Sequence, residues 1–232
     1  MVDVKDADIT ITALPTVTKK RSIFSKGIYL TLKRLFDIIA GIVGIIILIP
    51  LTLWVLIMKT ASRDKGPLFY YQLRIGKGGK LFKLYKFRSM VVGADDKLKE
   101  YLKNNPEEAK EYKKYKKIKN DPRVTKVGKF LRTTSLDEWP QFINVFIGQM
   151  SLTGPKPYLP HEKEDIGENA YNEIIKVKPG LTGPWQVSGR SNRTFEDRVM
   201  LDLEYIPKTG IKEDLKITLK TIQKVLKRDG SF

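Results

Sequence analysis

The longest apolar run of the chain covers residues 38–58, IIAGIVGIIILIPLTLWVLIM, and contains no charged side chain. Its 21 residues have the length and character of a membrane helix rather than of a buried core helix. Lys and Arg flank the run on both sides, whereas a single span normally has them on one side only. Pro50 removes one helical hydrogen bond and favours a kink. Two interpretations stay open: a re-entrant hairpin with both flanks on one side, or an ordinary Pro-kinked span.

The rest of the chain alternates between strand-like and helix-like patterns. Residues 66–90 alternate apolar and polar positions around a Gly-rich turn, which predicts a β-hairpin. Residues 95–120 are helix formers with charges of both signs, typical of a solvated helix face or of a surface for acidic lipid or nucleic acid. Residues 136–150 and 194–206 have helical periodicity, and Gly- and Pro-rich loops lie between them.

The two ends of the chain differ in pattern. Residues 212–228 predict an amphipathic helix, which either faces the core or lies at a membrane interface. Its apolar stripe consists of Leu215, Leu219, Ile222 and Leu226. Residues 1–30 show no strong apolar periodicity before the membrane segment and are expected to be an extended or disordered lead.

The composition limits the partners and the kinds of site that the chain can have. The chain has 43 Lys and Arg against 26 Asp and Glu, a net charge of +17, so its partners are expected to be anionic: nucleic acid, an acidic lipid surface or phosphorylated metabolites. The absence of Cys excludes disulfides, thiolate zinc sites and Cys nucleophiles. With one His, His161, a two-His metal site cannot form, and a Ser-His-Asp triad would have to use that residue.

Two adjacent acidic residues, Asp137 and Glu138, open the helical stretch after residue 133. In one interpretation Ser135 and Glu138 form a capping box and Pro140 fits the first turn. In the other, a carboxylate at a helix N-terminus stays ionised and attacks phosphorus or binds a hard cation, and its neighbour holds metal or substrate. Both interpretations use the same residues.

An attacking carboxylate would repel a diphosphate unless cations screened it. Five basic residues are candidates for this screening, although in so basic a chain each can equally be a surface charge. They are Lys86, Arg88, Arg132, Lys156 and Arg190.

Several segments together resemble the bacterial sugar transferases, the monotopic phosphoglycosyl transferase superfamily, over about residues 30–230. The resemblance lies in the interrupted hydrophobic run and in the ordered series KRLFDIIAG (33–41), LYKFRSM (84–90), DPRVTKVGKFLRTTSLDEWPQFINVFIGQMSLTGPKP (121–157), KPGLTGPWQVSGR (178–190) and LDLEYI (201–206). Each motif is weak alone, but their order is specific.

The resemblance implies an α/β-associated, mostly helical fold. It has a re-entrant membrane helix-break-helix at residues 31–60, bent near Pro50, and one compact catalytic domain at residues 61–232 with interfacial amphipathic helices and a short β-hairpin. It implies a monotopic protein of the cell membrane, with this domain on the cytoplasmic face against anionic inner-leaflet lipid. A homodimer stays open, and no nucleic-acid partner is expected.

The resemblance also implies a two-step reaction that starts surface polysaccharide assembly. Asp137 attacks the β-phosphate of a UDP-sugar, UMP leaves, and undecaprenyl phosphate intercepts the phosphosugar-aspartate. Glu138 is the partner of Asp137, and both hold Mg²⁺. Family positions linked to substrate match Lys86, Arg132 and Arg190; Gln186 lies in the same loop, and Asp214 matches a position of less certain role.

Two features depart from the family pattern or refine it. GPKP stands where GPRP is usual, so Lys156 keeps the charge and loses the guanidinium fork. The segment LTGPWQVSGR is nearer to the hexose-phosphate branch of the family, and this likeness favours galactose or glucose as the sugar.

Two other functions compete with the transferase: a non-catalytic membrane-anchored scaffold, and an anionic-polymer binder with salt-dependent affinity.

Overall fold

The computed structural model describes residues 23–118, 120–189 and 193–227, without the side chains of residues 23–26 and Leu226. The predicted lead therefore lies mostly outside the described residues. Residues 23–30, assigned to that lead, are instead the beginning of helix α1 (Ile23–Ala61). The low apolar periodicity there did not reveal that the helix extends beyond its membrane-like part.

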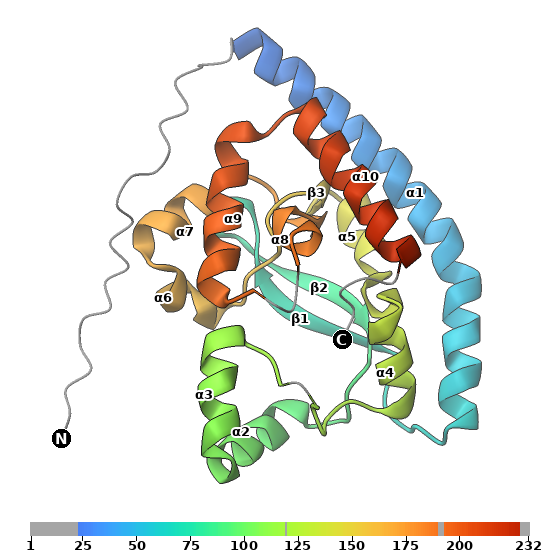
Figure 1. Cartoon of the computed structure of the whole chain (residues 1–232). Coiled ribbons are helices and arrows are strands. Elements are labelled where there is room, and N and C mark those ends of the chain that lie inside the picture. Colours follow the sequence, from blue (N-terminus) through green and yellow to red (C-terminus); the bar gives the residue numbers. More distant parts are fainter. Residues whose placement is uncertain (1–22, 119, 190–192, 228–232) are drawn as a thin grey trace, which may run out of the picture.

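Helix α1 is 39 residues long and continues through Pro50. The predicted break is wrong: Figure 1 shows a helix that bends part-way along its length, and the helical assignment is not interrupted. A proline removes one main-chain donor, and a long helix tolerates this loss by bending. Its segment Gly27–Ala61 is long and apolar enough to cross a membrane by length and composition. Many of its apolar side chains are exposed, Ile49 to 70 %.

The inner face of α1 packs against the rest of the protein through small residues. A Cβ on Gly41 would lie 2.8 Å from the Cβ of Phe146, and one on Gly44 would lie 2.1 Å from Cγ of Phe142, so only glycine permits this close approach to α5 (Gln141–Phe146). The indole of Trp139 donates to the Gly44 carbonyl at 2.9 Å. These contacts fix α1 against the segment that carries the acidic pair.

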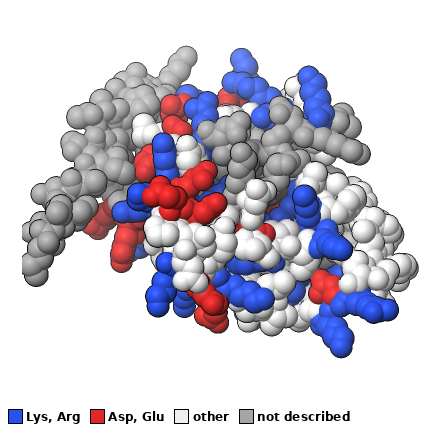
Figure 2. Space-filling model, turned by 60° about the horizontal axis from the view of Figure 1, so that its bottom comes forward, with Lys and Arg blue, Asp and Glu red and all other residues white. Residues whose placement is uncertain are grey.

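The predicted β-hairpin is confirmed. Strands β1 (Phe69–Ile75) and β2 (Leu81–Phe87) pair antiparallel around a 3-10 turn, η1 (Lys77–Gly79). The highly charged region that follows forms two helices, α2 (Ala94–Asn104) and α3 (Pro106–Tyr115). Figure 2 views the molecule from the end where these helices lie, and on this face Lys and Arg are interspersed with acidic residues. Neither helix contains a buried residue, and the choice between a solvated face and a surface for acidic lipid or nucleic acid stays open.

The remaining elements form the centre of the molecule around α4 (Lys126–Thr133) and α5. A second small sheet pairs β3 (Ser151–Thr153) in parallel with β4 (Gly180–Thr182). The sequence did not predict this sheet, because three-residue strands leave no alternating run. The other elements are η2 (Leu136–Glu138), η3 (Pro160–Glu162), α6 (Lys163–Ile166), α7 (Glu168–Ile174), α8 (Pro184–Val187), α9 (Phe195–Lys208) and α10 (Ile211–Lys227).

Helix α10 is the predicted amphipathic helix, and it runs near α1 (Figure 1). Leu215, Leu219 and Ile222 are each more than half exposed, whereas Ile217 is buried. The predicted stripe therefore does not face the protein core. Of the two interpretations left open for this helix, the exposed stripe favours an interfacial one.

Candidate active site

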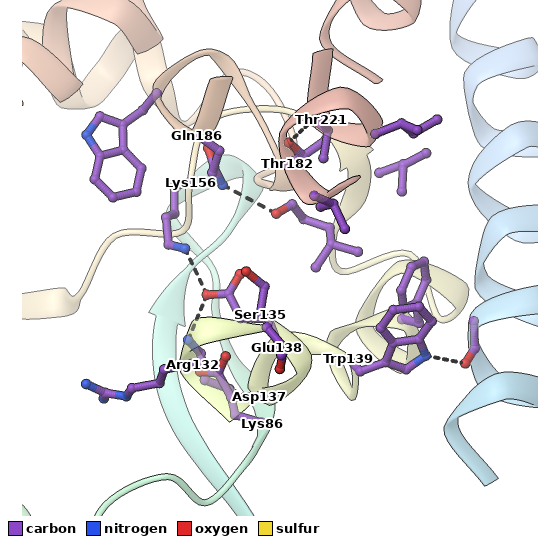
Figure 3. Close-up of a pocket in the computed structure, with 18 of the residues that line it drawn as sticks. Lys86, Arg132, Ser135, Asp137, Glu138, Trp139, Lys156, Thr182, Gln186 and Thr221 are labelled. Carbon is purple, nitrogen blue, oxygen red and sulfur yellow. Dashed lines mark hydrogen bonds and ion pairs between the residues drawn. The ribbon is translucent and has the colours of Figure 1, made fainter. Parts of the chain in front are cut away.

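Asp137 and Glu138 lie on η2, the short 3-10 turn between α4 and α5. Ser135, just before the turn, has a left-handed backbone with φ 58° and makes no side-chain cap. The predicted capping box is therefore wrong. The reversal of the chain at Ser135 ends the preceding helix and directs the Glu138 carboxylate towards residues from other parts of the fold (Figure 3).

Two lysine ammonium groups share one oxygen of Glu138. Lys86 Nζ, from β2, and Lys156 Nζ, from the loop after β3, each lie 2.9 Å from Glu138 Oε1 (Figure 3). All three side chains are between 21 % and 24 % exposed, so this pairing is only partly screened by water. The fold thus brings together three residues that the sequence could only propose one at a time.

The same cations act differently on the two carboxyl groups. Burial alone would raise the pKa of Glu138, but Lys156 and Lys86 outweigh it and hold that pKa well below its usual range. Burial raises the pKa of Asp137, opposed by Lys86, while the charge of Glu138 adds to the rise. Glu138 is thus a permanent counter-ion, and Asp137 is the more basic carboxylate. A more basic carboxylate is the better nucleophile once ionised.

Asp137 is also the carboxylate that is available for chemistry. It is buried, yet it accepts no hydrogen bond from the described residues and lines a cavity of about 700 Å³. Arg132, from α4, lines the same cavity and donates from Nε to Ser89 Oγ at 3.0 Å. Gln186, from α8, lines it as well and donates to the Leu181 carbonyl at 3.3 Å.

Of the residues predicted for substrate binding, two that the structure describes, Arg88 and Asp214, do not line this cavity. Arg88 stacks its guanidinium over the Tyr70 ring, with 5.3 Å between Cζ and the ring centroid, and does not line the cavity. Asp214 does not line it either. Arg190 lies outside the described residues.

Asp214 instead joins α10 to α1. Its Oδ2 accepts from the Lys33 ammonium at 2.6 Å and from the Tyr29 hydroxyl at 2.8 Å, while its Oδ1 accepts from the Tyr205 hydroxyl at 2.7 Å. Both oxygens are therefore occupied by partners within the protein. The geometry assigns Asp214 a structural role, and the predicted substrate contact is not supported.

The lining of the cavity differs from element to element. The residues that α1 contributes are all uncharged and apolar, among them Phe36, Ile39 and Val43, and α10 contributes Ile222 and Val225, whereas the charged lining residues come from other elements. The sequence did not predict these lining residues, because their proximity depends on the tertiary packing of α1 and α10.

Trp185, from α8, is another cavity residue that the sequence did not single out. Lys117 Nζ and Lys156 Nζ lie 5.6 Å and 5.7 Å from its ring centroid. It lies in the motif WQVSGR, which is the sequence signal for it, beside the expected substrate-binding residues Gln186 and Arg190. The cations beside this ring can pair with an anionic ligand, and the ring face can stack on a planar ligand.

The described residues contain no group of three His, Cys, Asp or Glu side chains that could hold a metal by themselves. Asp137 and Glu138 nonetheless offer two adjacent carboxylates beside an open cavity. Mg²⁺ is commonly held by one or two carboxylates together with substrate phosphates and water. The donor set fits a cation that arrives with a phosphate ligand better than one held by a complete protein cage.

Comparison with known protein families identifies the family of this chain. The family model described as bacterial sugar transferase matches residues 28–228, which include every element of the cavity. The chain belongs to this family. Within the transferase family, the long apolar helix of this member is consistent with membrane association.

Relatives of this transferase include proteins that are named for lipid-linked sugar transfer. The chain is 45 % identical over 201 residues to an undecaprenyl-phosphate galactose phosphotransferase of Salmonella typhimurium, covering 87 % of this chain and 42 % of the relative. It is 39 % identical over 205 residues to a UDP-glucose:undecaprenyl-phosphate glucose-1-phosphate transferase of Escherichia coli, covering 85 % and 41 %. It therefore spans about two fifths of the length of these relatives.

A third relative is similar to this chain over most of its own length. The exopolysaccharide production protein ExoY of Sinorhizobium fredii is 41 % identical over 200 residues, which is 86 % of this chain and 88 % of the relative. The alignment thus extends over nearly the whole of that protein.

Proposed function

We propose that the protein transfers a hexose-1-phosphate from a UDP-sugar to undecaprenyl phosphate and releases UMP. The observation that supports this most is the cavity itself, in which an open carboxylate, Asp137, lies among cations and apolar side chains of α1 and α10 form another part of the lining. A sugar diphosphate needs the first environment and an isoprenoid chain the second. Neither a scaffold nor a polymer binder needs both around a carboxylate.

The first step is the attack of an Asp137 oxygen on the β-phosphorus of the UDP-sugar. A bond forms between that oxygen and phosphorus, and the bond from phosphorus to the oxygen that bridges to the α-phosphate breaks. UMP leaves with this oxygen, and the sugar phosphate stays on Asp137. Lys86, Lys156 and Arg132 stabilise the charge that develops on the phosphates.

The second step returns Asp137 to its free form. An oxygen of undecaprenyl phosphate attacks the same phosphorus, and the bond between phosphorus and the aspartate breaks. Glu138 stays ionised throughout and keeps the two lysine ammonium groups directed towards the phosphates. Mg²⁺ bound by Asp137, Glu138 and the diphosphate would neutralise charge and orient the phosphates.

The names of the relatives favour galactose or glucose as the sugar, and one of them favours a role in exopolysaccharide production. We further propose that α1 enters and leaves the membrane on the cytoplasmic side, with the exposed stripe of α10 against anionic inner-leaflet lipid. The bend of α1 and the cations on both flanks of its apolar run support this topology. A single cysteine at Ser62 should then be shielded from a periplasmic thiol reagent in intact cells, and its labelling would contradict the hairpin.

The activity is tested with purified protein in nanodiscs, Mg²⁺, undecaprenyl phosphate and a panel of UDP-sugars. We expect UMP release with UDP-galactose or UDP-glucose and a sugar-phosphate adduct when the lipid is withheld. Folding is checked by thermal melting in the same nanodiscs. Folded protein that releases no UMP from any sugar would refute the proposal.

A further inference from the structure

The loop that carries Lys156 is held by its carbonyl groups. Pro155 and Pro157 flank this lysine and have no N–H, so hydrogen bonds at these two positions must be accepted by oxygen. Four consecutive carbonyls of the loop each have a donor from another element. The pairs are Gly180 N to Pro155 O at 2.7 Å, Arg198 Nη2 to Lys156 O at 3.0 Å, Arg74 Nη1 to Pro157 O at 3.0 Å and Ile75 N to Tyr158 O at 2.9 Å.

Two of the four donors are backbone amides, and the other two are guanidinium groups. Arg198, from α9, is the one that holds the carbonyl of Lys156 itself. It is 9 % exposed and lies over the Tyr158 ring, with 3.9 Å between Cζ and the ring centroid. The hydroxyl of Tyr158 is fixed in turn, because it donates to Asp202 at 2.8 Å.

Arg198 makes no ion pair within the described structure, although it is buried. A buried cation without an ion pair is costly, and here the charge interaction with Asp202, the stacking on Tyr158 and the bonds to loop carbonyls offset part of that cost. Its hydrogen bonds to described residues go to the backbone of the Lys156 loop, to the carbonyl of Lys156 at 3.0 Å and to that of Pro157 at 3.5 Å.

The position of this loop matters because lysine is a single charge on a flexible stem. Lys156 Nζ lies 2.9 Å from Glu138 Oε1, and among the described residues Lys86 Nζ is the other cation in contact with this oxygen. An arginine could reach two phosphate oxygens at once, but a lysine depends on its backbone to place its one ammonium group. A shift of the loop by about 1 Å would move this charge away from the dyad and from a bound diphosphate.

We propose that Arg198 is a positioning residue, which fixes the ammonium of Lys156 at the dyad by holding the Lys156 carbonyl. Its effect on catalysis rests on the proposed function, whereas its effect on the loop does not. Arg74, which holds the next carbonyl, contributes a smaller share. Neither arginine is among the residues that line the cavity, so both act through the loop.

The first test measures the loop without any need for turnover. Arg198→Lys keeps the charge and loses the fork, and Arg198→Met keeps most of the apolar stem. Each variant is treated at one pH with a short amine-acylating reagent, and modification of Lys156 is quantified by peptide mass spectrometry relative to exposed Lys99. We expect labelling of Lys156 to rise several-fold in both variants. Unchanged labelling would overturn the proposal.

The matched control is Arg34→Lys. Arg34 also donates to two consecutive carbonyls, of Val145 and Phe146, at 2.9 Å and 2.7 Å, but at the end of α5. This variant should lower the melting temperature without changing the labelling of Lys156. An equal rise in labelling in Arg34→Lys would show general loosening of the fold and would overturn a specific role of Arg198.

The second test uses the reaction. In Arg198→Lys we expect kcat/KM for the UDP-sugar to fall about 10- to 100-fold, mainly through KM, because Lys156 contacts the diphosphate before the chemical step. Millimolar guanidinium should restore part of the activity of Arg198→Ala and none of that of Arg34→Ala. A purely structural residue would lower activity only in proportion to folded protein and would show no rescue. If wild-type protein releases no UMP while the labelling result holds, the proposed function fails and the positioning of the loop stands.

Discussion

Two carboxylate clusters in this protein each contain a lysine contact but differ in their other contacts. Asp214 and Glu138 each accept from a lysine, at 2.6 Å and 2.9 Å. Every oxygen of Asp214 is occupied by Tyr or Lys donors, and the cluster joins two helices. Beside Glu138, in contrast, lies Asp137, which has no donor among the described residues and faces the cavity. We therefore propose that spare acceptor capacity beside a cavity, rather than a carboxylate–lysine contact, marks the chemical site.

Among the tests of this comparison, the substitution Asp137→Asn has the largest expected effect. We expect no covalent adduct in intact-protein mass spectra and a loss of UMP release on the order of a thousandfold or more, because the amide is not a nucleophile. The melting temperature should stay the same or rise, since burial already disfavours the charge of Asp137. An adduct that persists in the variant would assign the nucleophile to another residue.

The pH dependence of the wild-type enzyme belongs to the same test. Asp137 must be ionised to attack, and burial raises its pKa above the ordinary aspartate value. Adduct formation should therefore decline with falling pH at a higher pH than an ordinary aspartate would give. A rate that does not change down to the range of an ordinary aspartate would contradict the raised pKa.

A smaller effect, on stability, is expected for Asp214→Asn. The variant loses the ion pair with Lys33 and one acceptor for a tyrosine hydroxyl, so the free energy of unfolding should fall by about 2 to 3 kcal/mol. The melting temperature measures this change, while KM for the UDP-sugar should stay near its wild-type value. Glu213→Gln is the control, because the ion pair that Glu213 makes within the described residues is a 3.7 Å contact with Lys216. A variant that melts normally but loses substrate binding would return Asp214 to the site.

Local pattern was enough to predict some of these elements. Alternation around a Gly-rich turn identified the hairpin of β1 and β2, and the amphipathic period identified α10. The sequence pattern gave wrong predictions where backbone geometry or tertiary packing determines the local conformation. Ser135 adopts a left-handed conformation that no capping motif reveals, and α1 stays helical through Pro50. Three-residue strands such as β3 are too short to give a pattern.

Part of the candidate site could also be predicted from the sequence. Lys86, Arg132, Lys156 and Gln186 line the cavity with the acidic pair, whereas Arg88 does not. Charge and residue type alone could not separate these arginines, because their side-chain directions depend on the fold. The apolar part of the cavity could not be predicted from any one segment, since α1 and α10 are far apart in the chain.

The test with the smallest expected effect concerns Asp202, on α9. Its carboxylate differs from those of Asp137 and Asp214, because it has spare acceptor capacity but does not line the cavity. It is fully buried, and Oδ2 accepts from Tyr158 while Oδ1 has no partner among the described residues, yet it does not line the cavity. Burial raises its pKa to about 7, with Arg198 opposing the rise. If access to the cavity is what marks the chemical site, Asp202→Asn should leave the nucleophile intact and alter only stability.

The sign of that change follows from the raised pKa. The folded protein binds the proton of Asp202 more tightly than the unfolded chain, so the stabilising contribution is complete below the unfolded value near 3.8 and is lost as pH rises through about 7. Asp202→Asn cannot lose this contribution, and its melting temperature relative to wild type should rise between pH 5 and pH 8 by roughly 5 °C. Adduct formation should keep its wild-type extent. A variant that melts with the wild-type pH dependence and forms no adduct would show that an unsatisfied buried carboxylate can serve the chemistry without facing the cavity.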